Sequence, residues 1–174
     1  MGKDSEKQFK VFNSFAQQNN NYCWTLDKPE STMSLGSTLT KKFPDLSILL
    51  LYGPLGAGKT TLVKGIAKSL KIQEPITSPT FPLSQHYPLG SPPLVHLDLY
   101  RIEEKNAANE FFLQEEEESK AIGALMVVEW PERLSLPMPD AWRGKLEYSS
   151  ENQSRFFQLI PPLDKDNKLS ISSK

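Results

Sequence analysis

The sequence predicts an α/β fold with a mainly parallel central sheet flanked by helices and a C-terminal antiparallel hairpin. A continuous apolar run at residues 47–52 is typical of a strand buried on both faces of a parallel sheet, and residues 94–99 and 124–129 predict two further strands, the second also buried. Segments with helical apolar spacing lie between them, as strand-helix-strand units require. Two β-rich segments, 145–149 and 155–160, predict the hairpin, with residues 151–153 in its turn.

The other elements follow from spacing and proline placement. Residues 22–26 have the β-rich content of a short strand, and Pro29 suits the first turn of a helix that ends before Pro44. Residues 75–93 contain six prolines, which excludes a helix or an inner strand and predicts loop and edge structure. The predicted helices after the first cover residues 60–70 and 103–120.

Length and composition predict one domain with short tails. The chain has 174 residues, and we expect a flexible N-terminal tail at 1–21, a domain at 22–163 and a flexible C-terminal tail at 164–174. A net charge of −1 offers no broad basic surface, so we expect no DNA binding, and any work on RNA would have to be local or borrowed from a partner. Cys23 is the only cysteine, and no apolar run suits a membrane or a secretory signal, which predicts a cytoplasmic protein.

A phosphate-binding motif follows the first buried run. Residues 53–60 read G-P-L-G-A-G-K-T, which matches G-x-x-x-x-G-K-[ST] and predicts a P-loop NTPase. The glycines let backbone N–H groups converge on phosphate oxygens; Lys59 adds a full charge, and the Thr60 hydroxyl suits Mg²⁺. The alternative is a glycine-rich turn with a solvated lysine. The candidate nucleotide-binding residues are Gly53, Leu55, Gly56, Ala57, Gly58, Lys59, Thr60 and Thr61.

Two acidic residues end predicted strands. Asp98 closes the run V-H-L-D, and Glu129 closes V-V-E. Carboxyl ends of parallel strands share one edge of the sheet, so both acids should lie beside the phosphates. One would hold the metal and the other would orient or deprotonate the attacking water, unless either is only a helix cap or a surface charge.

Three further features have two interpretations each. The segment Thr77–Thr80 (T-S-P-T) is either a loop that senses the γ phosphate or an ordinary proline turn. Arg101 is either a charge for the transition state or a salt-bridge partner. Trp130 either stacks on a base or packs in the core.

Other polar residues are interpreted as structural. His86 and His96 lack a partner at metal-binding spacing, and Glu115–Glu118 are expected to form a solvated helix face.

Taken together, five ordered segments resemble the TsaE family, also called YjeE, over roughly residues 22–160. They are E-S-T-M-S-L-G at 30–36, L-Y-G-P-L-G-A-G-K-T-T at 51–61, T-S-P-T-F at 77–81, H-L-D-L-Y-R at 96–101 and V-E-W-P-E-R at 128–133. The N-terminal extension and the acidic segment 110–118 depart from the family's compact form; the extension is interpreted as an ornament, whereas the acidic segment presents a different surface to partner proteins.

The resemblance implies a slow, Mg²⁺-dependent ATPase that acts with the TsaB and TsaD proteins in threonylcarbamoylation of tRNA. The modified base is the adenosine next to the anticodon in tRNAs that read codons beginning with A, and tRNA is met only through the complex. Carried over by position, Thr60 and Glu129 would bind Mg²⁺, Asp98 would be a catalytic or water-positioning acid with Lys59, and Thr80 and Trp130 would lie near the nucleotide.

Two rival functions fit a P-loop. A small-molecule kinase also begins with such a strand and helix, but it usually has an arginine-rich lid, and we find no such segment. A nucleotide-gated switch, whose hydrolysis only times the release of a partner, differs little from the leading hypothesis.

Overall fold

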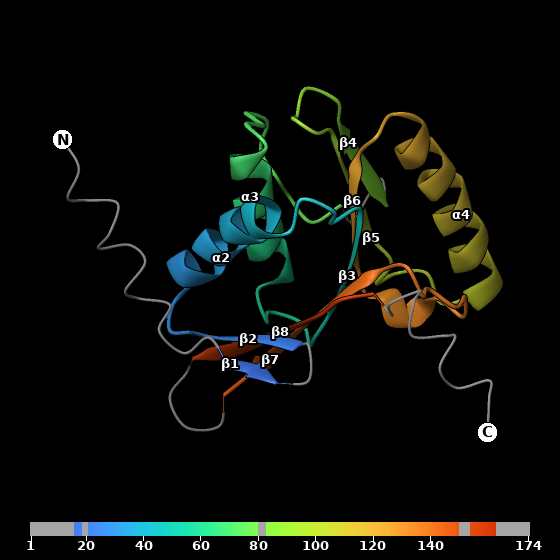
Figure 1. Cartoon of the computed structure of the whole chain (residues 1–174). Helices are drawn as coiled ribbons and strands as arrows, with labels where there is room; N and C mark the ends of the chain where they lie inside the picture. The colour runs from blue at the N-terminus through green and yellow to red at the C-terminus, as the bar shows by residue number, and fades with distance from the viewer. Residues whose placement is uncertain (1–15, 19–20, 80–82, 150–153, 163–174) are drawn as a thin grey trace, which may run out of the picture.

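The computed structural model describes residues 16–18, 21–79, 83–149 and 154–162. Within them an eight-stranded sheet runs in the order β1-β2-β8-β7-β3-β6-β5-β4 (Figure 1). The strands are β1 Ala16–Gln18, β2 Asn21–Leu26, β3 Ile48–Tyr52, β4 Ser84–Tyr87, β5 Leu94–Asp98, β6 Leu125–Glu129, β7 Trp142–Tyr148 and β8 Arg155–Ile160. The helices are α2 Pro29–Lys42, α3 Lys59–Ser69 and α4 Lys105–Ala121, and a short 3-10 helix spans Pro131–Arg133.

Strand direction changes from the centre of the sheet to its edges. β7, β3, β6 and β5 are parallel neighbours, whereas β4 pairs antiparallel with β5 at one edge. At the other side β8 pairs antiparallel with β7, and these two strands form the C-terminal hairpin. β8 also pairs antiparallel with β2. The predicted fold class is therefore confirmed, and the proline-rich segment supplies the edge strand β4, whose four residues include no proline.

Helices cover both faces of the sheet because alternate residues of each inner strand point to opposite sides. Leu49 and Leu51 pack in the core under α2 and α3, whereas Ile48 and Leu50 pack in the core under α4. Figure 1 shows α2 and α3 together on one side and α4 alone on the other. All five residues of β5 and all five of β6 are buried, which explains why apolar residues dominate both strands and why the polar His96, Asp98 and Glu129 are buried with them.

Two glycines bring α2 and α3 into close contact. A Cβ atom on Gly65 would lie 1.9 Å from the carbonyl oxygen of Met33, and one on Gly36 would lie 2.2 Å from that of Leu62. The Ser37 hydroxyl also donates to the Gly65 carbonyl across 2.7 Å. This contact fixes α3, and with it the P-loop that precedes α3, against the N-terminal helix.

The structure differs from the sequence expectation at the N-terminal tail. Ala16–Gln18 form β1, which pairs antiparallel with β2, although we had assigned residues up to 21 to a loose tail. A polar sequence offers no side-chain signal for an edge strand that is joined through its backbone groups. The C-terminal tail and the turn residues 151–153 lie outside the described residues. No helix in the described part of the chain is long and apolar enough to cross a bilayer.

Candidate nucleotide-binding site

The P-loop connects β3 to α3, and its backbone depends on glycine. Gly58 is the N-cap of α3 with φ of 105°, a left-handed conformation that residues with a side chain rarely adopt. Gly53 has φ of 141°, and a Cβ atom there would lie 2.4 Å from the carbonyl oxygen of Leu146. The loop can therefore place its N–H groups at the start of α3, where anions bind.

Lys59 is buried inside the loop, with 5% of its surface exposed. Its Nζ donates to the carbonyl oxygens of Gly53, at 2.7 Å, and Pro54, at 3.1 Å. It also lies 4.1 Å from the centroid of the Trp130 ring, a distance suited to a cation–π contact. The Trp130 ring thus borders Lys59, and it also contacts the Tyr100 ring at a centroid distance of 4.7 Å.

The electrostatic environment of Lys59 has two opposing parts. Burial lowers the pKa of the Lys59 ammonium group, and the nearby carboxylates of Glu129, Glu132 and Asp98 raise it in the opposite direction. The lowering dominates because desolvation penalises the charged form. A phosphate chain would supply further negative charge and would favour the ammonium form.

The two strand-tip acids lie side by side at the P-loop. Asp98 and Glu129 are paired in register across β5 and β6, and both are buried. The Thr60 hydroxyl donates to Oε1 of Glu129 across 2.9 Å. The structure thus brings the two predicted metal ligands into contact, with the predicted catalytic acid on the neighbouring strand.

Asp98 is held through both of its carboxylate oxygens. Oδ1 accepts a hydrogen bond from the Tyr100 backbone N–H at 3.0 Å, and Oδ2 accepts one from the Ser78 hydroxyl at 2.5 Å. Ser78 belongs to the T-S-P-T segment, so this segment reaches the acid, as a sensing loop would. Thr80, the residue of that segment named as a nucleotide contact, lies outside the described residues.

These groups surround one cavity of about 360 Å³, a size that falls within the usual range for small-molecule sites. Most of the predicted residues line it, whereas Gly53 and the buried Ala57 do not. The lining residues are Leu55, Gly56, Gly58, Lys59, Thr60, Thr61, Ser78, Asp98, Tyr100, Arg101, Glu129 and Trp130.

His96 has a partner that the sequence did not reveal. Its Nε2 lies 3.0 Å from Oε1 of Glu129, and its side chain is fully buried. The interpretation of His96 as a structural residue did not include this contact, because it joins the neighbouring strands β5 and β6 and the spacing along one chain cannot show it. His96 Nδ1 has no hydrogen-bond partner among the described residues.

Two more polar side chains beside the P-loop were missed. Thr32 Oγ1 and Arg155 Nε are buried without a hydrogen-bond partner in the described part of the chain. A Cβ atom on Gly58 would lie 3.6 Å from Thr32 Cγ2 and 3.7 Å from Arg155 Nε, so both side chains flank the loop. Unpaired buried polar atoms of this kind call for a missing partner such as a ligand. Thr32 sits in the E-S-T segment, whereas nothing local distinguished Arg155.

Known proteins resemble this chain over most of its length. Residues 26–157 match the family described as "Threonylcarbamoyl adenosine biosynthesis protein TsaE". A protein of Nostoc sp. named tRNA threonylcarbamoyladenosine biosynthesis protein TsaE is 46% identical over 132 residues, which cover 76% of this chain and 81% of the relative. The protein of that name in Aquifex aeolicus is 36% identical over 110 residues, covering 62% of this chain and 75% of its own.

A solved structure has the same fold. The crystal structure of YdiB from Bacillus subtilis superposes with a TM-score of 0.60 and 24% sequence identity, covering 86% of this chain and 90% of that one. The match with the family spans well over half of the sequence and includes the P-loop and both strand-tip acids. This chain therefore belongs to the TsaE family.

Proposed function

We propose that this protein binds and hydrolyses ATP with Mg²⁺ and serves as an accessory ATPase in threonylcarbamoylation of tRNA. The target is the adenosine next to the anticodon in tRNAs that read codons beginning with A, and the partners are the TsaB and TsaD proteins. One observation carries the ATPase part: the P-loop hydroxyl of Thr60 meets Glu129 at 2.9 Å in the cavity that Lys59 and Asp98 line. Family membership supports the pathway.

The donor set at this edge fits Mg²⁺. Thr60 Oγ1 and the Glu129 carboxylate are oxygen ligands of the kind that Mg²⁺ prefers, and both line the cavity. They would hold the ion, whose charge would neutralise the phosphate oxygens. His96 Nε2 contacts Oε1 of Glu129 and so orients this carboxylate, as residues next to a metal ligand commonly do.

Asp98 is suited to orient the attacking water. A carboxylate has about four lone-pair sites, and the structure assigns one to Ser78 and one to Tyr100, which leaves capacity for a water molecule. In this step the water oxygen bonds to the γ phosphorus while the bond to the ADP oxygen breaks. Asp98 accepts the hydrogen bond from the water, and the proton that the water loses passes to the inorganic phosphate or to solvent. Lys59 would exchange its two carbonyl contacts for phosphate oxygens.

The proposed partners are supported by family membership and by the weak overall charge. A net charge of −1 gives little attraction to an RNA backbone. We therefore propose that tRNA is contacted through the TsaB and TsaD proteins, in the cytoplasm, and that ATP hydrolysis resets or activates their complex between turnovers.

The test of the pathway is genetic. Depletion of the endogenous protein should lower threonylcarbamoyladenosine in bulk tRNA, and this gene should restore it, whereas its Lys59→Ala variant should not. Mass spectrometry of tRNA nucleosides measures the outcome. The matched control is Lys64→Ala, an exposed lysine on the same helix α3. An unchanged level of the modified nucleoside after depletion contradicts the proposal.

The nucleotide part is tested separately by calorimetry. Lys59→Ala should weaken binding of Mg-ATP at least about tenfold, because it removes the fixed charge at the β and γ phosphates. Lys64→Ala should bind as the unmodified protein does. Full affinity in the Lys59 variant would show that the loop does not hold a triphosphate.

The metal role of Glu129 predicts a different pattern. Glu129→Ala should retain much of the nucleotide affinity while turnover of ATP falls about tenfold to a hundredfold in the presence of the partner pair. Phosphate release at saturating ATP measures this. Equal turnover would remove Glu129 from the metal site.

A further inference from the structure

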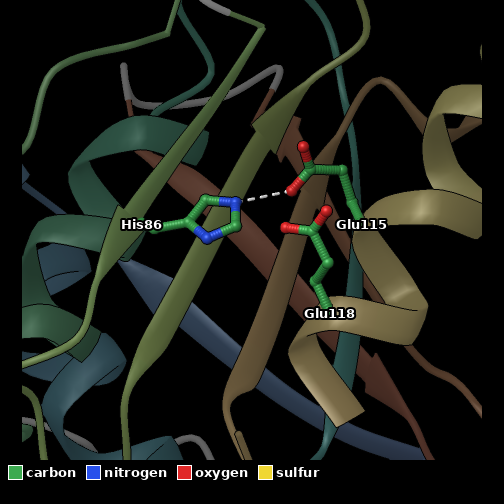
Figure 2. Close-up of side chains that lie close together, drawn as sticks. All are labelled: His86, Glu115 and Glu118. Carbon is green, nitrogen blue, oxygen red and sulfur yellow. Dashed lines mark hydrogen bonds and ion pairs between the residues drawn. The ribbon is translucent and has the colours of Figure 1, made fainter. Parts of the chain in front are cut away.

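Three potential metal ligands lie between strand β4 and helix α4. Helix α4 covers the face of the sheet opposite to helices α2 and α3 (Figure 1). His86 comes from β4, and Glu115 and Glu118 come from α4, where their spacing of three places them on the same helix face. One ligand atom from each residue lies within 4.8 Å of the other two. Figure 2 shows the imidazole and both carboxylates turned toward a common space.

Glu115 is the buried member of this group. Only 6% of its surface is exposed, which corrects the expectation that residues 115–118 are a solvated helix face; α4 turns Glu115 toward the sheet. His86 Nε2 lies 2.6 Å from Oε2 of Glu115. The Ser84 hydroxyl donates to the other oxygen, Oε1, across 2.8 Å.

The cluster also has outer contacts that orient its ligands. Ser84 fixes one oxygen of Glu115 and leaves the other toward His86. Gln114 donates through Nε2 to Oε1 of Glu118 across 3.3 Å. Hydrogen bonds of this kind, made to the ligand residues by their neighbours, are typical of built metal sites.

We propose that His86, Glu115 and Glu118 bind a divalent transition-metal ion, with Zn²⁺ as the best fit. Tetrahedral Zn²⁺ has bonds of about 2.0–2.1 Å to nitrogen and oxygen, which puts its ligand atoms about 3.3 Å apart. His86 and Glu115 would separate by about 0.7 Å from their present 2.6 Å. The exposed Glu118 side chain would close its own gap by rotation. Water would complete the coordination.

The ligand types select the ion. An imidazole nitrogen with two carboxylates suits Zn²⁺ and its neighbours in the first transition row, whereas Mg²⁺ prefers oxygen ligands alone. Two carboxylates balance the charge of a divalent ion. Whichever of His86 and Glu115 carries the proton of their hydrogen bond, that proton leaves to solvent when the ion binds.

The chain offers two internal reporters, because it contains only two histidines. His86 belongs to the proposed ion site, and His96 contacts Glu129 in the nucleotide site. Ring-nitrogen NMR spectra of the full-length protein, titrated with ZnCl₂ in excess Mg²⁺, therefore tell the two sites apart. We expect the His86 resonances to shift and saturate at one equivalent while those of His96 stay in place. His86→Gln assigns the signals.

Variants complete the test. By calorimetry, His86→Gln and Glu118→Gln should each weaken Zn²⁺ binding at least about tenfold. Glu117→Gln, an exposed neighbour on the same helix with the same change in charge, should not. Glu118→Gln also guards against misfolding, because Glu118 is exposed and can be replaced without disturbing the buried pair.

Three results would overturn the proposal. They are the absence of Zn²⁺ binding up to millimolar concentration, binding that survives both variants, and a shift of His96 in place of His86. The first would leave His86 and Glu115 as an ion pair that only attaches α4 to β4. The first two results do not bear on ATP binding, which Lys59→Ala tests independently, whereas the third would place the ion beside Glu129 in the nucleotide site.

Discussion

The two histidines of this chain make the same contact in two different surroundings. His96 Nε2 meets Glu129 at 3.0 Å with no exposed surface, and His86 Nε2 meets Glu115 at 2.6 Å at the exposed edge of the sheet. Each glutamate also accepts a hydrogen bond from a hydroxyl, from Thr60 in the first case and Ser84 in the second.

The neighbours of each pair, and not the pair itself, indicate its role. Around Glu129 stand a P-loop lysine and a second acid, Asp98, in a cavity large enough for a small ligand. Glu115 lies beside His86 and a further carboxylate, that of Glu118, and this group of three includes no phosphate-binding residue. A histidine–glutamate contact is therefore compatible with phosphate chemistry in one place and with ion binding in the other. The predictions below test whether the two surroundings differ as strongly as this implies.

The largest difference should appear in ATP turnover. Asp98→Asn should lower turnover about 10²–10⁴-fold, because a neutral amide orients and polarises the attacking water far less than a carboxylate does. ATP affinity should change little. Phosphate release with the partner pair present measures turnover, and calorimetry measures affinity. Glu117→Gln, at an exposed position on helix α4, serves as the control. A normal rate in Asp98→Asn would show that Asp98 does not orient the attacking water.

The second difference should appear in stability. His96→Ala should lower the free energy of unfolding by about 3 kcal/mol, because it leaves a cavity and a buried carboxylate that keeps only its contact with Thr60. His86→Ala should cost about 1 kcal/mol or less, since solvent reaches its partner once the ring is gone. Urea denaturation without metal or nucleotide compares the variants. Equal losses would mean that burial does not separate the two pairs.

The arrangement of the candidate nucleotide-binding site could be predicted from the sequence because its parts are local. The P-loop is one continuous segment, and Asp98 and Glu129 each end an apolar run, so the rule that parallel strand ends share an edge was enough to bring them together. The same apolar runs predicted the parallel centre of the sheet, with strands buried on both faces.

The rest depends on contacts between distant segments. His86 and Glu115 are 29 residues apart and meet only because β4 lies at the sheet edge beside α4. Arg155 reaches the P-loop because β8 returns beside β7, and no local pattern encodes that pairing. A run of acids such as 115–118 likewise does not show which member a helix turns inward, since the apolar stripe of α4 is weak there.

The smallest difference should appear when the serine beside each acid loses its hydroxyl. Ser84→Ala should cost about 1 kcal/mol of stability, the usual contribution of one hydrogen bond, and should leave turnover unchanged, because Glu115 faces no substrate. Ser78→Ala should cost a similar amount of stability but should also lower turnover several-fold, because Ser78 holds Asp98 in the cavity. Denaturation and phosphate release on the same preparations give both numbers. The contradicting outcome is a Ser84→Ala variant that slows ATP turnover as much as Ser78→Ala does. That result would mean that a change in β4 alters Asp98 through the neighbouring strand β5, and that the two clusters act as one functional unit.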